Sequence, residues 1–172
     1  LMNALIGTDD EIPLPSPCYS LWSNNAYLCG GKPVFYRCDP NNEWNPDIDD
    51  INSKITDRTK AILVINPNNP TGAVYPKETL LKLVDIAREF GLIIFADEVY
   101  DKILYEDAKH IAIASLSTDV LTITFNSLSK AYRACGYRAG WMIISGNKLP
   151  ARDFIEGLNM LANMKLCANV PG

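Results

Sequence analysis

The chain has 172 residues, 48% of them hydrophobic and 21% charged, and its 16 basic and 20 acidic side chains give a net charge of −4. This length predicts one domain, and the composition excludes a disordered or low-complexity protein. No run of Lys or Arg offers a surface to nucleic acid or anionic lipid, and the longest apolar run, residues 91–96, is far too short to span a membrane. We therefore expect a soluble globular domain without nucleic-acid or membrane partners.

The cysteines and the histidine argue against several kinds of site. An odd number of cysteines, none in a C-x-x-C spacing, indicates neither a zinc site nor a disulfide framework and suits a reducing cytoplasm. These cysteines are Cys18, Cys29, Cys38, Cys135 and Cys167. The single histidine, His110, makes a multi-histidine metal site impossible and disfavours Ser-His-Asp or Cys-His catalysis. We expect no metal, and we expect His110 in a surface loop.

The first third of the chain contains three predicted elements. Residues 1–6 resemble the middle of a helix, which suggests a chain cut out of something longer. Residues 33–37 follow a Gly-Gly turn and have the pattern of a short strand. Residues 45–54 predict a helix in which Asn45 is the N-cap and Pro46 occupies the first helical position.

The rest of the chain alternates between apolar strands and amphipathic helices. The continuous apolar run at residues 61–65 predicts a strand buried on both faces. Residues 76–90 predict a helix with Phe90 on its apolar face and Gly91 as its C′ residue. Further strands are predicted at residues 92–96, 121–125 and 140–144, and a last helix at residues 150–164. This alternation favours an α/β fold with a mostly parallel sheet.

Three of the predicted strands end in clusters of polar residues. The clusters are residues 66–72, residues 97–100, and residues 126–130 with Arg138 shortly after them. Because ligands bind beyond the carboxyl ends of the strands in an open parallel sheet, we expect the three clusters to surround one crevice. They would bring amide, carboxylate, phenol, hydroxyl, amine and guanidinium groups together.

The chemistry of these groups favours one cofactor. Neither a G-x-G-x-x-G nor a P-loop motif occurs, so dinucleotide and nucleotide-phosphate sites lose their main support. Lys130 is suited to forming an imine, and an acid such as Asp97 can hold a heteroaromatic nitrogen protonated. Ser127, Ser129 and Arg138 supply donors suited to a phosphate. Together these requirements describe pyridoxal 5′-phosphate held as a Schiff base by a lysine.

Each of these groups has a plainer interpretation when it is taken alone. The Asn-Pro-Thr-Gly sequence at residues 69–72 is commonly a turn, and Asp97 alone is often a helix cap. Lys130 alone would be a solvated charge, and Arg138 alone would belong to a surface ion pair. The combination, in this order and at successive strand ends, is what favours a cofactor site.

The sequence resembles the fold-type I pyridoxal-phosphate aminotransferases of the class I/II family over essentially its whole length. The matching stretches, which include a lysine followed eight residues later by an arginine, are residues 66–75, 95–100, 127–130 and 136–140. Within this family the chain is most similar to bacterial glutamate–pyruvate (alanine) aminotransferases. That closer likeness rests on residues 101–105, 123–126 and 165–171.

The resemblance implies a role for each polar residue around the expected crevice. Lys130 is similar to the lysine that binds the cofactor covalently and then moves a proton between the substrate Cα and the cofactor. Asp97 is similar to the acid that pairs with the pyridine nitrogen. Tyr100 and Asn69 resemble the two donors to the phenolic oxygen of the cofactor, and Asn69 would also touch the substrate carboxylate.

The same resemblance implies how the phosphate and the ring face are held. Ser127 and Arg138 are similar to phosphate ligands, and Ser129 is a further candidate. Tyr19, in the Pro-Cys-Tyr stretch, resembles the aromatic residue that stacks on the cofactor ring. Its plainer interpretation is a core tyrosine near a strand end.

The resemblance also implies an architecture. The fold would be a three-layer α/β/α large domain with a mostly parallel sheet, and residues 1–172 would form the central part of this cofactor-binding domain. The phosphate-binding loop would lie upstream of residue 1. The small domain, with the arginine that pairs with the substrate carboxylate, would follow residue 172. The full-length form is expected to be a cytoplasmic homodimer.

The favoured function is transamination between an amino acid, L-alanine first, and a 2-oxo acid, 2-oxoglutarate first, with ping-pong kinetics. One alternative is a pyridoxal-phosphate-dependent carbon–sulfur β-lyase on the same fold, which needs no oxo-acid acceptor. A second is a non-catalytic, aminotransferase-like effector-binding domain of a transcription regulator. A third is that this chain by itself has no activity.

Overall fold

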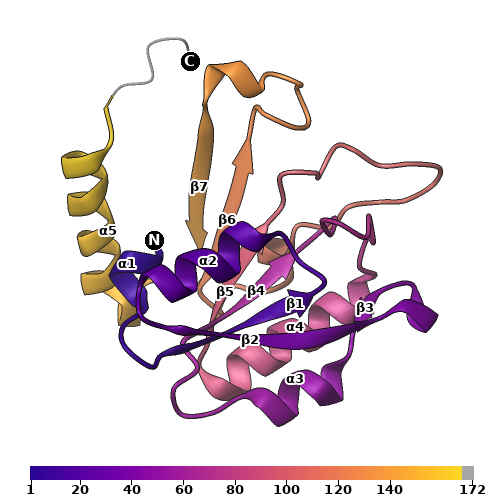
Figure 1. Ribbon diagram of the computed structural model, residues 1–172, viewed down its shortest axis with the longest axis horizontal. Coiled ribbons are helices and arrows are strands. Elements are labelled where there is room, and N and C mark those ends of the chain that lie inside the picture. Colours follow the sequence, from indigo (N-terminus) through magenta and orange to yellow (C-terminus); the bar gives the residue numbers. More distant parts are fainter. Residues whose placement is uncertain (168–172) are drawn as a thin grey trace.

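A computed structural model describes residues 1–167 of the protein, and in it helices lie on both sides of a layer of strands (Figure 1). The end of the predicted stretch 165–171 lies outside the described residues. The strands are β1 (Glu11–Ser16), β2 (Lys32–Asp39), β3 (Asn45–Pro46), β4 (Ala61–Ile65), β5 (Ile93–Asp97), β6 (Thr122–Ser127) and β7 (Gly140–Ser145). The α-helices are α1 (Met2–Leu5), α2 (Ser20–Leu28), α3 (Ile48–Lys54), α4 (Lys77–Phe90) and α5 (Arg152–Lys165). Short 3₁₀ helices are η1 (Pro40–Asn42), η2 (Ile113–Leu116), η3 (Cys135–Tyr137) and η4 (Leu149–Ala151).

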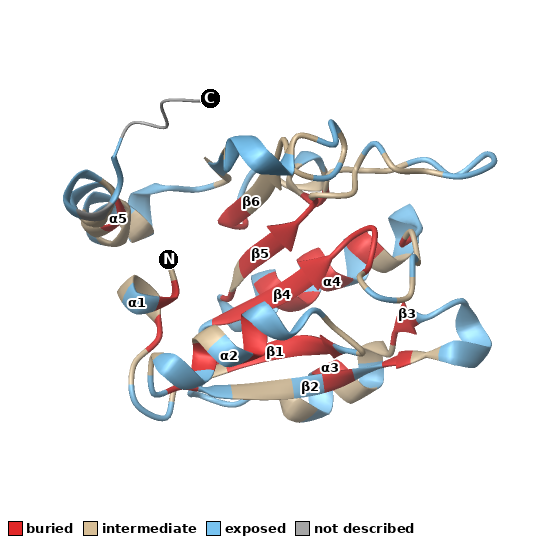
Figure 2. Ribbon diagram, turned by 45° about the horizontal axis from the view of Figure 1, so that its top comes forward, coloured by how far each residue is buried: buried red, intermediate tan, exposed pale blue. Residues whose placement is uncertain are grey.

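The strands form two sheets that lie side by side. In the first, β1 pairs parallel with β2, and β2 pairs antiparallel with the short β3. In the second, β4, β5 and β6 are parallel neighbours, and β7 joins β6 in the antiparallel sense. Figure 2 shows β2, β1, β4 and β5 following one another across the molecule. The predicted α/β fold with mostly parallel strands is therefore confirmed.

A junction that we call the β1–β4 seam separates the two sheets. The backbone N–H of Glu11 donates to the Arg58 carbonyl over 2.9 Å, at one isolated parallel bridge. The ladder does not continue, because Pro13 and Pro15 follow in β1 and have no backbone N–H to donate. A side chain crosses the seam instead: the buried hydroxyl of Tyr36, on β2, donates to the Leu63 carbonyl of β4 over 2.8 Å.

The hydrophobic core has two halves, one on each face of β4. Ile62 and Val64 pack with buried residues of α3 and α4, which cover one face. The alternate residues Ala61, Leu63 and Ile65 pack with buried residues of α1 and α2 on the other face. Because side chains alternate along a strand, a strand between two helical layers must be apolar throughout. The prediction that residues 61–65 are buried on both faces is confirmed, and so are the three layers.

Helix α4 follows its prediction closely, except at its last residue. It begins one residue after Pro76 and ends at Phe90, followed by Gly91, whose φ of 65° is a left-handed conformation that glycine adopts without strain. The expectation that Phe90 lies on the buried face is wrong, because this side chain, in the last turn, is 44% exposed. Ile86 is buried instead.

The predicted start of α3 is wrong. Asn45 and Pro46 are not the cap and first turn of the helix; they form β3 and pair with the end of β2. The helix begins at Ile48 with Asp47 as its N-cap, because the Asp47 Oδ1 atom accepts the backbone N–H of Asp50 over 3.1 Å. Asn45 is buried, and its Nδ2 atom donates to the Asn42 carbonyl over 3.0 Å.

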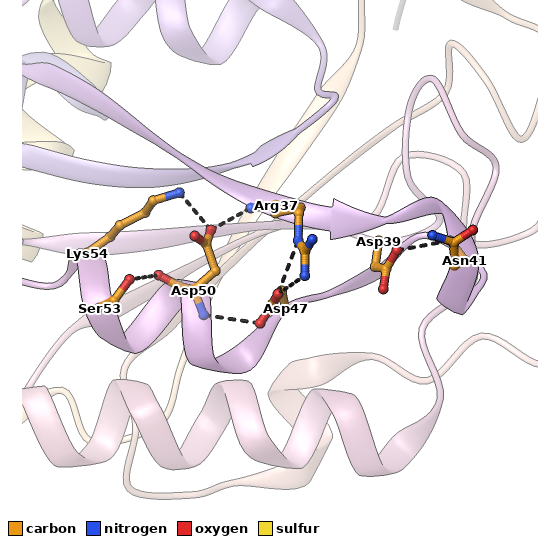
Figure 3. Close-up of polar contacts among 7 residues, drawn as sticks. All are labelled: Arg37, Asp39, Asn41, Asp47, Asp50, Ser53 and Lys54. Carbon is orange, nitrogen blue, oxygen red and sulfur yellow. Dashed lines mark hydrogen bonds and ion pairs between the residues drawn. The ribbon is translucent and has the colours of Figure 1, made fainter.

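Charged side chains fasten α3 to β2 (Figure 3). The second carboxylate oxygen of Asp47 accepts hydrogen bonds from the Arg37 guanidinium, the shorter at 2.5 Å. Asp50 accepts the backbone N–H of Arg37 over 2.8 Å and the ammonium of Lys54 over 2.7 Å. Lys54 also donates to the Phe35 carbonyl over 2.7 Å. These bonds lower the pKa of both carboxyl groups, although burial opposes the shift at Asp50.

Residues 1–167 contain neither a membrane-spanning helix nor a cluster of metal ligands. No helix in this part of the chain has the length and apolar character needed to cross a membrane. No group of three or more His, Cys, Asp or Glu side chains there is arranged to hold a metal ion. The five cysteines are free thiols.

Candidate active site

A cavity of about 480 Å³ lies at the carboxyl ends of β4, β5 and β6. Its walls come from the residues after β1 and β4, the end of β5, and the segment between β6 and β7. All eight residues predicted from the sequence line it: Tyr19, Asn69, Asp97, Tyr100, Ser127, Ser129, Lys130 and Arg138. The three polar clusters therefore do surround one crevice, as strand order in a parallel sheet predicts.

Asp97 is the last residue of β5 and only 8% exposed. Its Oδ2 atom accepts the indole N–H of Trp22 over 2.8 Å, and its Oδ1 atom accepts a longer bond of 3.4 Å from the backbone N–H of Val99. Burial raises the pKa of this carboxyl above its ordinary value, while the bond from Trp22 opposes that rise. The site thus contains a carboxylate that gains from a further hydrogen-bond donor.

The loop after β4 is fixed by its own side chains. Asn66 accepts the backbone N–H of Tyr75 over 2.9 Å, which ties the two ends of the loop together. Asn68 donates to the Tyr75 hydroxyl over 3.2 Å and accepts the Thr71 hydroxyl over 3.1 Å. The buried Asn66 and Asn68 thereby hold the loop in shape, and Asn69 is left at the cavity wall.

The segment after β6 carries the lysine and the arginine. The Lys130 ammonium lies 5.7 Å from the ring centroid of Tyr100, within range of a cation–π contact. The Ser127 hydroxyl accepts the backbone N–H of Ser129 over 3.3 Å. Arg138 has a left-handed φ of 53°, and its Nη1 atom donates to the Cys135 carbonyl over 2.8 Å. The hydroxyls and the guanidinium are thus available on one wall for an anionic group.

The expectation that His110 is a surface residue is wrong. Its side chain is only 11% exposed, and its Nε2 atom lies 3.2 Å from the carboxylate of Glu98, which is 6% exposed. The other Glu98 oxygen accepts the backbone N–H of Ile113 over 3.0 Å. A buried carboxylate requires such partners, so the loop between Tyr100 and η2 folds back to supply them.

Sequence reasoning also missed Trp22 and Cys135. Cys135 lines the cavity next to Arg138. Trp22 lies behind Asp97, and its ring packs against Phe125 at a centroid distance of 5.2 Å and against Phe95 at 6.3 Å. The sequence offers only a general indication for Trp22. A buried indole N–H usually has a hydrogen-bond partner, and the acids at the end of β5 are candidates for that partner.

A known protein family and individual known proteins match nearly the whole chain. A family described as aminotransferase class I and II matches residues 1–169. The chain belongs to this family. Glutamate-pyruvate aminotransferase AlaA of Escherichia coli K12 is 59% identical over 170 residues, or 99% of this chain and 42% of AlaA. Alanine aminotransferase of Mycobacterium tuberculosis H37Rv is 58% identical over 170 residues, covering 99% of this chain and 40% of that enzyme.

The fold agrees with this family assignment. The crystal structure of an aminotransferase from E. coli superposes with a TM-score of 0.97 at 59% identity, covering 99% of this chain and 42% of that one. The predicted membership in the class I and II aminotransferases is confirmed, and so is the closer likeness to alanine aminotransferases. The chain spans about two fifths of the length of these relatives.

Proposed function

We propose that this chain is part of a pyridoxal-phosphate-dependent aminotransferase that moves an amino group between L-alanine and a 2-oxo acid such as 2-oxoglutarate. One observation carries the proposal: an amine, a buried carboxylate and a guanidinium, from Lys130, Asp97 and Arg138, line a single cavity in a member of this family. The names of the relatives that are 58–59% identical favour alanine as the amino donor.

The residues around the cavity fit pyridoxal phosphate in their chemistry. Lys130 is an amine on a flexible stem, and Arg138, Ser127 and Ser129 offer donors to a phosphate. Asp97, with a pKa raised by burial, gains from a cationic N–H partner, which a protonated pyridine supplies. When bound, pyridoxal phosphate supplies an electron sink for the negative charge that forms when the substrate Cα loses its proton.

The residues would divide the work of transamination as follows. Lys130 would provide the covalent anchor for the cofactor and, as a free amine, would act as the general base that takes the proton from the substrate Cα. Asp97 holds the ring nitrogen in its protonated form. Tyr100 and Asn69 donate to the phenolic oxygen, and Asn69 also contacts the substrate carboxylate.

The remaining cavity residues hold the cofactor in place. Ser127, Ser129 and Arg138 bind the phosphate by charge-assisted hydrogen bonds. Tyr19, about half exposed at the cavity wall, stacks on the ring. These residues would hold the cofactor and orient it in the cavity.

We further propose that residues 1–172 are the central part of a large domain. The complete enzyme would add a phosphate-binding loop before them and a small domain with a carboxylate-binding arginine after them, and it would work in the cytoplasm as a homodimer without nucleic-acid or membrane partners. The two-fifths share of the relatives' length supports this division. We expect the isolated chain to lack turnover for the same reason.

The test uses the visible absorption spectrum. The chain is studied alone and in a chimera in which it replaces the matching 170 residues of E. coli AlaA. With added pyridoxal phosphate, the chimera should form a visible band that disappears with L-alanine and returns with 2-oxoglutarate. Lys130→Ala should abolish the band, whereas Lys82→Ala, an exposed lysine on α4, should not. A chimera without a Lys130-dependent band would refute the proposal.

The same samples separate transamination from its alternatives. A carbon–sulfur β-lyase would release pyruvate from a cystathionine-like substrate when no oxo acid is added. An effector-binding domain would bind an amino acid without converting it. Conversion of alanine that requires an oxo-acid acceptor supports the aminotransferase.

A further inference from the structure

Trp22 has no part in the chemistry proposed above, yet it makes the shortest side-chain contact of the candidate acid. The two residues are 75 positions apart in the sequence, and only the fold brings them into contact. Trp22 belongs to α2 and Asp97 ends β5, so their bond of 2.8 Å links a helix on one face of the second sheet to the end of a strand in that sheet. Its distance falls in the range of a strong, direct hydrogen bond.

The indole ring is held firmly. Trp22 is 9% exposed and packs against two aromatic rings, edge-on to Phe125 and tilted to Phe95. These contacts restrict rotation of the indole, so its N–H points in a fixed direction. A donor that cannot turn away restrains the orientation of the carboxylate that it contacts.

The bond leaves the two oxygens of Asp97 unequal. Oδ2 is taken by the indole N–H, whereas Oδ1 accepts only the 3.4 Å bond from Val99 within residues 1–167. Each carboxylate oxygen can accept two hydrogen bonds, and Oδ1, which is engaged only by the long bond, gains more from a further donor than Oδ2 does; Asp97 itself lines the cavity. Glu98 is also buried beside Asp97, but its two oxygens are occupied by His110 and the backbone N–H of Ile113.

We propose that Trp22 is a positioning residue: its N–H anchors Oδ2 of Asp97, so that Oδ1 is presented to the ring nitrogen of the cofactor. This inference rests on the proposed function. Packing alone does not account for Trp22, because a phenylalanine would supply an aromatic ring without placing an N–H against a buried carboxylate. The donor also stabilises the anionic form of Asp97, since hydrogen bonds to buried charges are stronger than those between neutral groups.

The test compares two cofactors that differ at one atom. Pyridoxal phosphate has the ring nitrogen, and 1-deazapyridoxal phosphate has a carbon in its place. Their dissociation constants are measured by equilibrium dialysis with the AlaA chimera. The ratio of the two constants isolates the contact at the ring nitrogen, because contacts with the phosphate and the phenolic oxygen are common to both.

Two replacements of Trp22 are measured beside a matched control. Trp22→Phe removes the donor and part of the ring, whereas replacement by 3-benzothienylalanine keeps the shape of the indole and removes only the N–H. Trp44→Phe is the control, because Trp44 is 36% exposed in the turn between β2 and β3. We expect both Trp22 replacements to lower the preference for pyridoxal phosphate about tenfold, and the control to leave it unchanged.

The outcomes separate this inference from the proposed function. If the unsubstituted chimera shows no preference for pyridoxal phosphate, the role of Asp97 is wrong and the inference falls with it. If the preference exists but both Trp22 replacements retain it, the inference alone is overturned. Equal weakening of both cofactors would show that Trp22 only supports packing and would also overturn it.

Discussion

The hydroxyl of Tyr36 should contribute measurably to the stability of the β1–β4 seam, and Tyr36→Phe removes that hydroxyl alone. Both groups of its 2.8 Å bond are inaccessible to water, because Tyr36 and Leu63 are 0% exposed. Burial also raises the pKa of Tyr36 well above its ordinary value, so the phenol stays neutral and keeps its donor throughout the physiological range. The substitution leaves the aromatic ring in place.

The expected cost follows from leaving a buried acceptor without a donor. Removing one partner of a buried hydrogen bond costs about 1–3 kcal/mol. Pro13 and Pro15 cannot replace the lost donor, because they have no N–H. For a chain of this size, each kcal/mol lowers Tm by roughly 2–4 °C, so a loss of about 2 kcal/mol corresponds to roughly 4–8 °C.

Urea unfolding followed by circular dichroism measures this cost. The matched control is Tyr27→Phe, because Tyr27 is 62% exposed on α2 and its hydroxyl faces water. The control should change the free energy of unfolding by less than about 0.5 kcal/mol. If Tyr36→Phe changes it as little as the control does, the Leu63 carbonyl has another partner and the reasoning about the seam is refuted.

Three further predictions concern single contacts. His110→Ala should destabilise the chain by about 2 kcal/mol in urea unfolding, since it strips a partner from buried Glu98, and His110→Gln, which keeps a donor, should cost less. Gly91→Ala should cost about 1 kcal/mol, because the left-handed φ of 65° strains any residue with a Cβ; a gain in Tm would contradict this. The hydrogen bond from Arg88 lowers the pKa of Asp119 in the folded chain. The contribution of Asp119 to stability is therefore fully present above its unfolded pKa of about 3.9, and it is lost as the pH falls toward the lower pKa of the folded chain. Stability should therefore fall on acidification less steeply in Asp119→Asn than in the parent chain, as pH-dependent melting curves would show.

The elements predicted best from the sequence are those whose pattern depends on local rules. The apolar run at residues 61–65 and the amphipathic helix closed by Gly91 were both placed within one residue. Strand β1 had no such signal, because Pro13 and Pro15 are residues that normally argue against a strand. Both prolines lie at the β1–β4 seam, where no regular ladder of backbone hydrogen bonds needs their N–H groups.

Two of the wrong predictions concern the start of α3 and the exposure of His110 in the loop before η2. In both cases the sequence allows more than one arrangement, and contacts between distant residues decide which one forms. Asn45 and Asp47 are both good N-caps by residue type, and pairing with β2 decides between them. His110 follows a polar stretch that suggests exposure, but its side chain is buried because it contacts the buried carboxylate of Glu98, 12 positions earlier.

The cavity residues could be grouped because each follows a strand end, and the strand order brings those ends together. Their positions as cavity-lining residues followed from this rule and from the family resemblance together. The partner of Asp97 could not be found this way, since the contact with Trp22 spans 75 positions.

The cavity draws its walls from residues as far apart in the chain as Tyr19 and Arg138. Such a site exists only when the complete fold exists, and the unfolded chain has nothing equivalent to offer a ligand. Any molecule bound there is therefore coupled to global folding: at a concentration one hundred times its dissociation constant, it adds about 2.7 kcal/mol to the free energy of unfolding. Conversely, a substitution far from the cavity that leaves much of the chain unfolded should weaken apparent binding without touching one contact.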